Sequence, residues 1–324
     1  MRPAMPGGKG RSEEGSMEKQ SLRGSLLLLL GSVIWGAAFA AQRVGMEHIG
    51  PMTFIWIRMM ISTVVMLPVI RLMDSVGGGR KEKPTPEKRR EQWKAGLICG
   101  TFLFVASALQ QAGLVYTTAG KAGFITALCV VLVPVAGWLI FRRNPGRMIW
   151  IGVGIAVVAL YLLCMSGDGF ELQTGDLLML GCAICFTGQI LSVDYYAPRV
   201  DGARLACMQF LVSGVLGILV AGVTEGFSMA GVREAMPALL YTGVMSGAAG
   251  YTLQIFGQRE TNPTVASLLM CLESVFAVLT GAILLGEKMT GRETAGCILM
   301  FLAVILAQLS PVIARRRRGE PLPH

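Results

Sequence analysis

The sequence predicts an all-α integral membrane protein with about ten transmembrane helices, arranged as two inverted repeats of five helices each. Three observations lead to this fold class: an apolar composition, a series of charge-free segments long enough to cross a bilayer, and a weak duplication of the chain. Hydrophobic residues make up 53% of the 324 residues and charged residues 15%, whereas soluble domains average about 25% charged residues. A pair of soluble domains would need polar helix faces that this composition mostly lacks.

Ten segments are apolar enough to be membrane spans. Crossing the hydrocarbon core takes about 20 apolar residues in a helix, and backbone groups that find no water there must pair within their own segment. Two of the ten segments, near 51–70 and 264–285, carry one charge each. The other eight carry none: 24–42, 95–120, 122–141, 148–167, 177–193, 205–224, 235–258 and 294–314.

The lysines and arginines lie mainly on one side of these ten spans. With the N-terminus inside, 23 of the 29 fall in inside segments, five fall outside, and Arg58 falls within a span. Cytoplasmic loops carry such an excess of positive charge. Both termini are therefore expected in the cytoplasm, with the chain in a plasma membrane such as a bacterial inner membrane. The net charge of +9 is explained by these loops and requires no nucleic-acid partner.

The chain divides into four segments. Residues 1–21 are polar and glycine-rich and are expected to form a disordered cytoplasmic tail. Residues 22–164 and 174–312 hold the two five-helix repeats, and residues 313–324 form a basic cytoplasmic tail with four consecutive arginines.

The two repeats open with similar segments. LGSVIWGAAF (30–39) begins the first, and LGCAICFTGQ (180–189) begins the second, 150 residues later. Because each repeat has an odd number of spans, the second enters the membrane in the opposite orientation. Inverted repeats of this kind are frequent in secondary transporters.

Two longer stretches carry a family resemblance. They are ALQQAGLVYTTAGKAGFITALCVVLVPVAGWLIFRR (108–143) and AAGYTLQIFGQRETNPTVASLLMCLESVFAVLTGAILLGEKMTG (248–291), the second of which ends in LLGE and a short turn. Both resemble the EamA-type family of the drug/metabolite transporter superfamily, and the resemblance extends from about residue 22 to residue 312. It implies ten spans, two inverted five-helix repeats, and transport of a small organic solute, amino-acid-like or drug-like and usually exported. The chain departs from the family pattern at Ser274, where a proline is common, and the first repeat lacks the Gly-Glu pair that ends the second stretch.

Two charged residues fall inside spans, Arg58 in the second and Glu273 near the middle of the ninth. A charge at bilayer depth costs at least about 2.5–3.5 kcal/mol on insertion scales, so such residues usually face a cavity or pair with one another. Glu273 is therefore a candidate to contact a cationic group or carry a coupling proton, and Arg58 is a second candidate for solute binding. The alternatives are an ion pair between the two, or a protonated Glu273 that holds helices together.

Polar side chains at helical spacing add further candidates for solute binding. Gln110 and Gln111 lie in the third span, and Tyr251 and Gln254 lie in the eighth. Amides within membrane helices need partners, so either a solute cavity or hydrogen bonds between helices would explain them. Trp35 in the first span either lines the same cavity or packs between helices.

Pro134 lies inside the fourth span. Proline removes a helical hydrogen bond and kinks the helix. We therefore expect a hinge there, which alternating access to a central cavity would use.

Other classes of function fit the sequence less well. All eight cysteines lie in expected spans, where cysteine behaves as a small apolar residue, and there are two histidines, so no metal or cofactor is expected. The sequence has no nucleotide-binding P-loop and no nucleophile motif, so an enzyme is not expected. The expected partners are a small organic solute, the lipid bilayer and a coupling ion, either proton or sodium; a homodimer and a non-transport scaffold or regulatory role remain open.

Overall fold

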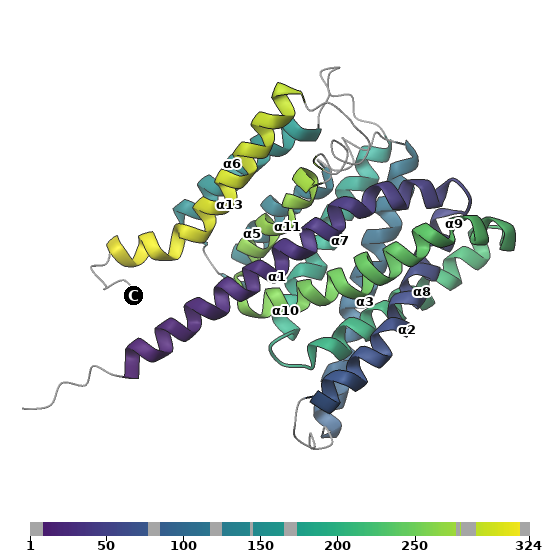
Figure 1. Cartoon of the computed structure of the whole chain (residues 1–324), viewed down its shortest axis with the longest axis horizontal. Coiled ribbons are helices and arrows are strands. Elements are labelled where there is room, and N and C mark those ends of the chain that lie inside the picture. The colour runs from purple at the N-terminus through teal and green to yellow at the C-terminus, as the bar shows by residue number, and fades with distance from the viewer. Residues whose placement is uncertain are drawn as a thin grey trace, which may run out of the picture.

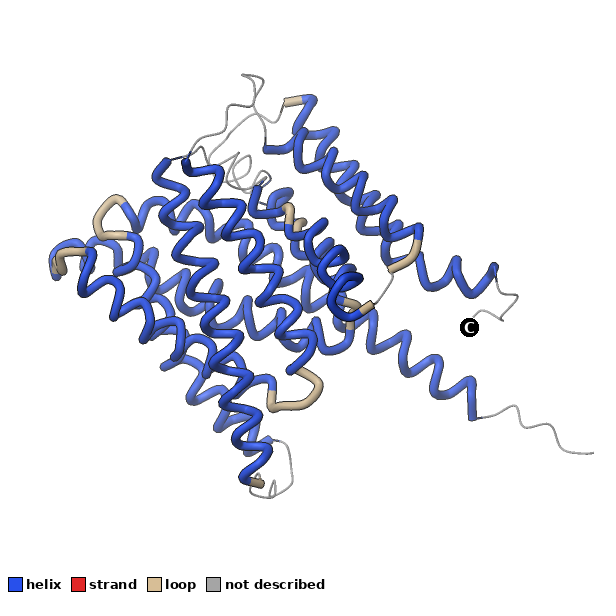
Figure 2. The backbone as a smooth tube through the Cα atoms, turned by 180° about the vertical axis from the view of Figure 1, so that it is seen from behind, coloured by secondary structure: helices blue, strands red, loops and turns tan. Residues whose placement is uncertain are grey.

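The structure is a computed structural model that describes residues 9–76, 85–116, 125–142, 145–164, 174–276, 279 and 290–317. Within these ranges the chain consists of helices joined by short turns, and no strand occurs in them (Figure 2). The principal helices are α1 (Lys9–Met46), α2 (Pro51–Val76), α3 (Pro86–Tyr116), α5 (Cys129–Phe141), α6 (Arg147–Cys164), α7 (Thr174–Tyr196), α8 (Gly202–Thr224), α9 (Met229–Tyr241), η1 (Thr242–Tyr251), α10 (Thr252–Glu260), α11 (Pro263–Met270) and α13 (Gly291–Arg317).

Four helices are long and apolar enough to cross a membrane: α2, α3, α7 and α8. Four shorter apolar helical segments, of 10 to 17 residues, occur at Leu22–Ala38, Ile125–Ile140, Arg147–Leu162 and Pro263–Phe276. The all-helical, multi-span architecture is thus confirmed for the described residues. The number of ten spans and the inverted orientation of the second half remain predictions.

Both ends of the described chain are helical where the sequence predicted tails. Helix α1 begins at Lys9, so the backbone of residues 9–21 is helical where a disordered tail was expected. Helix α13 likewise continues to Arg317, through the first part of the expected basic tail. A helix need not end where the hydrocarbon ends, because it satisfies its own backbone hydrogen bonds in water as well. In Figures 1 and 2 the start of α1 extends beyond the bundle, on the side where α13 ends.

The most extensive helix contacts join the two halves of the chain. Helix α3 packs on α7 and on α8, α2 packs on α8, α1 packs on α10, and α6 packs on α13; the pair α6 and α13 lies side by side along one flank of the molecule (Figure 1).

Glycines allow several of these helices to approach closely. The G-x-x-x-G pair in α3 faces α8, because a Cβ on Gly96 would lie 2.6 Å from Met208 Cβ and one on Gly100 would lie 2.7 Å from Val212 Cβ. The second pair, Gly243 and Gly247 in η1, faces α2. Small residues at helix contacts are typical of membrane bundles.

Replacing Gly247 by alanine is expected to destabilise the fold. The new Cβ would overlap Ser62 Oγ, and Ser62 is fixed because its hydroxyl donates to Gly243 O at 2.7 Å. Overpacking of this kind typically costs about 1–3 kcal/mol, which lowers the melting temperature by several degrees. Thermal unfolding of the purified protein in detergent measures this, with Gly222→Ala as the control, because a Cβ at Gly222 meets nothing within 4 Å. Equal melting temperatures for the two variants would contradict the tight contact between η1 and α2.

Candidate functional site

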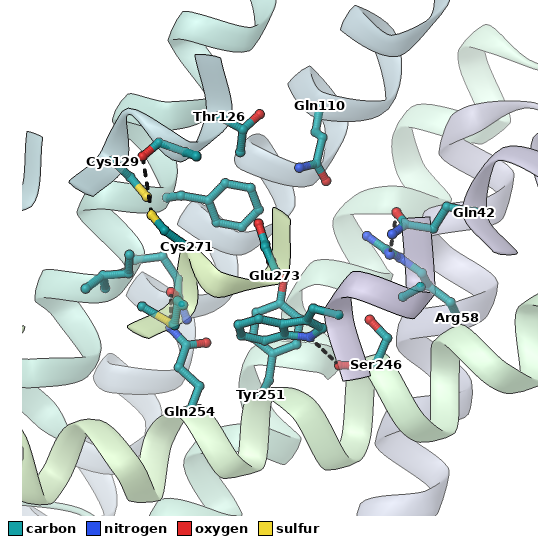
Figure 3. A pocket seen from close by; sticks show the side chains of 17 residues that line it. Gln42, Arg58, Gln110, Thr126, Cys129, Ser246, Tyr251, Gln254, Cys271 and Glu273 are labelled. Atoms are coloured by element: carbon teal, nitrogen blue, oxygen red, sulfur yellow. Dashed lines mark hydrogen bonds between the residues drawn. The ribbon is translucent and has the colours of Figure 1, made fainter. Parts of the chain in front are cut away.

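A cavity of about 90 Å³ lies in the interior of the bundle. This volume is several times the roughly 10–15 Å³ that a cavity needs to hold one water molecule. Polar groups converge on it among apolar walls, as is usual for sites that bind small molecules (Figure 3). The lining residues are Trp35, Ala38, Gln42, Arg58, Gln110, Thr126, Ala127, Cys129, Phe186, Gln189, Ile190, Ser246, Tyr251, Gln254, Met270, Cys271 and Glu273.

Two helical segments with a local irregularity meet at the cavity. Leu128, just before α5, and Cys271, just after α11, each form a single-residue turn that keeps right-handed helical backbone angles, so the helices are irregular there but not unwound. Residues next to both turns line the cavity, and the Cys271 thiol donates to Ala127 O at 3.6 Å.

The π-helix η1 supplies another wall of the cavity. It runs for ten residues from Thr242 to Tyr251, whereas most π-helical segments are single turns that frequently occur at functional sites. The indole Nε1 of Trp35 donates to Ser246 O at 2.9 Å, and the ring centroids of Trp35 and Tyr251 lie 5.0 Å apart. These contacts join α1 to η1 and give the cavity an aromatic wall.

Arg58 lies on α2 with 5% of its surface exposed. Its Nη1 donates to Gln42 Oε1 at 3.0 Å, and the same oxygen accepts from Gln111 Nε2 at 2.7 Å. The guanidinium carbon also lies 5.9 Å from the centroid of the Phe54 ring. Nε of Arg58 has no hydrogen-bond partner, and no acidic residue of the described chain forms an ion pair with this arginine. Neutral amides therefore hold its positive charge in place without neutralising it.

Glu273 extends into the cavity from the helical segment that follows Cys271 (Figure 3). Among the described residues no hydrogen bond or ion pair to its carboxylate is found. In particular, Glu273 and Arg58 both line the cavity but are not joined by an ion pair, which was one of the alternatives left open by the sequence. A partly buried carboxylate and a buried guanidinium thus share one cavity, and each is available to a solute.

The cavity brings together six of the seven residues that the sequence singled out for solute binding. These six are Trp35, Arg58, Gln110, Tyr251, Gln254 and Glu273. Gln111 does not line the cavity and instead holds Gln42, the partner of Arg58. Pro134, the expected hinge, is buried inside α5, outside the lining. That these residues bind a solute, or that Pro134 bends, remains a prediction.

Sequence reasoning missed several polar lining residues, above all Gln42 and Gln189. Gln42 is the last residue of the first charge-free run, and Gln189 ends the segment LGCAICFTGQ that was used only as a repeat marker. An amide within an apolar span needs a hydrogen-bond partner, and this signal would have identified both. The contribution of Ser246 could not be foreseen, since its backbone carbonyl is exposed to Trp35 only by the π-helical backbone.

Comparison with known proteins identifies the family. The model of the EamA-like transporter family matches residues 22–165 and 173–309, so the chain belongs to this family, and it is a multi-pass membrane protein. The two matched segments agree with the two repeats expected from the sequence.

Two relatives are named as a transporter and an exporter, and a solved structure shares the fold. An uncharacterized transporter of Archaeoglobus fulgidus is 29% identical over 304 residues, which covers 92% of this chain and 90% of the relative. The threonine/homoserine exporter RhtA of Salmonella typhimurium is 27% identical over 189 residues, covering 58% of this chain and 61% of that protein. A solved crystal structure with 15% sequence identity matches the fold with a TM-score of 0.73, covering 90% of this chain and 98% of that one.

Proposed function

We propose that this protein is a secondary transporter that exports a small amino acid or a similar zwitterion across the plasma membrane by alternating access. One observation carries this proposal: Arg58 and Glu273 line the same cavity with opposite charges and do not pair with each other. A solute with one negative and one positive group would neutralise both. Binding of such a zwitterion would offset the free-energy cost of two unpaired charges at bilayer depth.

In this account each end of the solute has its own partner. The Arg58 guanidinium binds the solute carboxylate, for which its planar fork of donors is well suited, and Gln42 holds the guanidinium in position. The Glu273 carboxylate binds the solute ammonium. The small cavity volume, about 90 Å³, favours an amino acid over a large drug-like molecule. The relative RhtA is named a threonine/homoserine exporter, which supports the same class of solute.

The Glu273 carboxylate is also the group that would couple solute transport to an ion. After the ammonium leaves, Glu273 would remain as an uncompensated charge in the cavity, and a proton is the smallest cation that can replace it. We therefore expect the solute and a proton to occupy Glu273 in turn, so that inward proton movement drives outward solute movement.

Several features support alternating access as the mechanism. The irregular turns at Leu128 and Cys271 adjoin the cavity, and Pro134 lacks the N–H that would complete the hydrogen bonds of α5. Rocking of the two repeats about these points would open the cavity first to one side and then to the other.

Efflux from proteoliposomes tests the proposal. Vesicles containing the purified protein are loaded with one labelled solute at a time, from a panel of amino acids, amines and carboxylic acids, and efflux is followed with and without an inward proton gradient. We expect saturable efflux of small amino acids that the gradient accelerates, and none from protein-free vesicles. Efflux of amines or carboxylic acids in preference to amino acids would contradict the proposed solute class.

A further inference from the structure

Three glutamines form a chain of amides that begins at the cavity and runs into the helix bundle. Gln254 Nε2 donates to Gln189 Oε1 at 3.0 Å, and Gln189 Nε2 donates to Gln209 Oε1 at 3.4 Å. The three residues belong to α10, α7 and α8, and none of them is more than 3% exposed. Gln254 and Gln189 line the cavity, whereas Gln209 lies behind them.

The chain leaves one hydrogen-bonding group unpaired at its cavity end. Gln254 Oε1 has no hydrogen-bond partner, and in Figure 3 it lies on the side of the amide that faces the aromatic rings. The amide nitrogen of Gln254 is engaged by Gln189 Oε1, which fixes the orientation of the amide as it stands. An unpaired buried carbonyl costs free energy, and a hydrogen-bond donor on a bound solute would remove this cost.

The chain also restricts which solute group fits. In the orientation described, the free atom of Gln254 is Oε1, which accepts a hydrogen bond and therefore needs a donor on the solute. If all three amides were turned by 180°, the oxygen and nitrogen of each would exchange positions, and the free atom of Gln254 would be Nε2, which donates. A hydroxyl group both donates and accepts, so it pairs with Gln254 in either direction, whereas a methyl group pairs in neither.

We propose that Gln254, held in orientation by Gln189 and Gln209, selects amino acids whose side chain carries a hydroxyl group over aliphatic amino acids of the same size. This inference rests on the proposed function, since it assigns the solute carboxylate to Arg58 and the ammonium to Glu273 and thus leaves the solute side chain for Gln254. Sites built around a buried hydrogen-bonding group reject analogues that lack the matching group, because the protein group is then left unpaired.

Efflux of L-threonine and L-valine from proteoliposomes measures this selection, because the two differ by a hydroxyl in place of a methyl group. For the wild type we expect threonine to be preferred by about tenfold or more. For Gln254→Leu the preference should fall close to one. Gln258→Leu is the matched control: Gln258 lies one turn further along α10, is 2% exposed, donates to Ile190 O and does not line the cavity, so this variant should keep the wild-type preference.

A second variant keeps the inference testable if Gln254→Leu does not fold. Gln189→Met keeps the length of the side chain but removes the acceptor that orients Gln254, and it should also lower the ratio of threonine to valine efflux. Equal efflux of both amino acids by the wild type, or an unchanged ratio in both Gln254→Leu and Gln189→Met, would overturn the inference while leaving amino-acid transport intact. Failure of the wild type to carry threonine or valine, while it carries another amino acid of the panel, would overturn the inference alone; failure to carry any amino acid of the panel would overturn the proposed function as well.

Discussion

Replacing Glu273 by glutamine is expected to reduce amino-acid efflux by at least about 30-fold. The substitution keeps the shape of the side chain but removes the negative charge that the proposed mechanism uses to bind the solute ammonium. Loss of one partner from a buried charge pair costs about 2–5 kcal/mol, and each 1.4 kcal/mol corresponds to a factor of ten. The same variant should lose acceleration by a proton gradient, because its amide cannot carry the proton.

Glu234→Gln is the control for this variant. Glu234 lies on α9, where it is exposed and contacts His48 at 3.0 Å, so the substitution makes the same change of charge away from the cavity. Efflux and its response to the proton gradient should match those of the wild type. If Glu273→Gln retained rapid, gradient-dependent efflux in folded protein, Glu273 would be a structural residue and another group would carry the coupling ion.

Replacing Arg58 by glutamine has the second-largest expected effect. The variant loses the cation proposed to bind the solute carboxylate, and Gln42 Oε1 loses one of its two donors. We expect amino-acid efflux to fall by about 30-fold or more, on the same 2–5 kcal/mol scale. Arg58→Lys should recover only part of the activity, because a lysine ammonium lacks the planar fork that binds a carboxylate in a bidentate manner.

Arg204 serves as the control that distinguishes an effect on solute binding from an effect on protein stability. Arg204 forms ion pairs with Asp74 at 2.6 Å and with Asp201 at 3.0 Å, and it is not among the residues that line the cavity. Arg204→Gln is therefore expected to lower thermal stability in detergent while leaving the choice of solute unchanged. The role assigned to Arg58 is wrong if its glutamine variant, like that of Arg204, changes stability alone.

Much of the fold was predictable because membrane insertion imposes strong rules on sequence. Charge-free runs of sequence identified the apolar helices. The helical course of residues 9–21 was not predicted, because polar composition says little about a helix that continues out of the membrane. The irregular turns at Leu128 and Cys271 were also not predicted, since neither position has a proline or glycine next to it that would signal an irregularity.

The candidate site was predictable where a residue was conspicuous within its own span. Arg58 and Glu273 stood out as charges, and the spacing of Tyr251 and Gln254 placed both on one helix face; all four line the cavity. Arrangements that depend on packing between distant helices could not be foreseen. The contact of Gln189 with Gln254 joins residues 65 positions apart, and no local pattern reports such a pairing.

Competition for efflux in the wild-type protein tests the central claim most directly. Efflux of a labelled small amino acid would be measured against increasing concentrations of L-alanine, of ethylamine, which lacks the carboxylate, and of L-lactate, which lacks the ammonium. If Arg58 and Glu273 each bind one end of a zwitterion, alanine should compete at least about tenfold better than either of the other two, because each of these leaves one buried charge unpaired. Equal competition by ethylamine or by lactate would contradict the claim that both charges bind the solute.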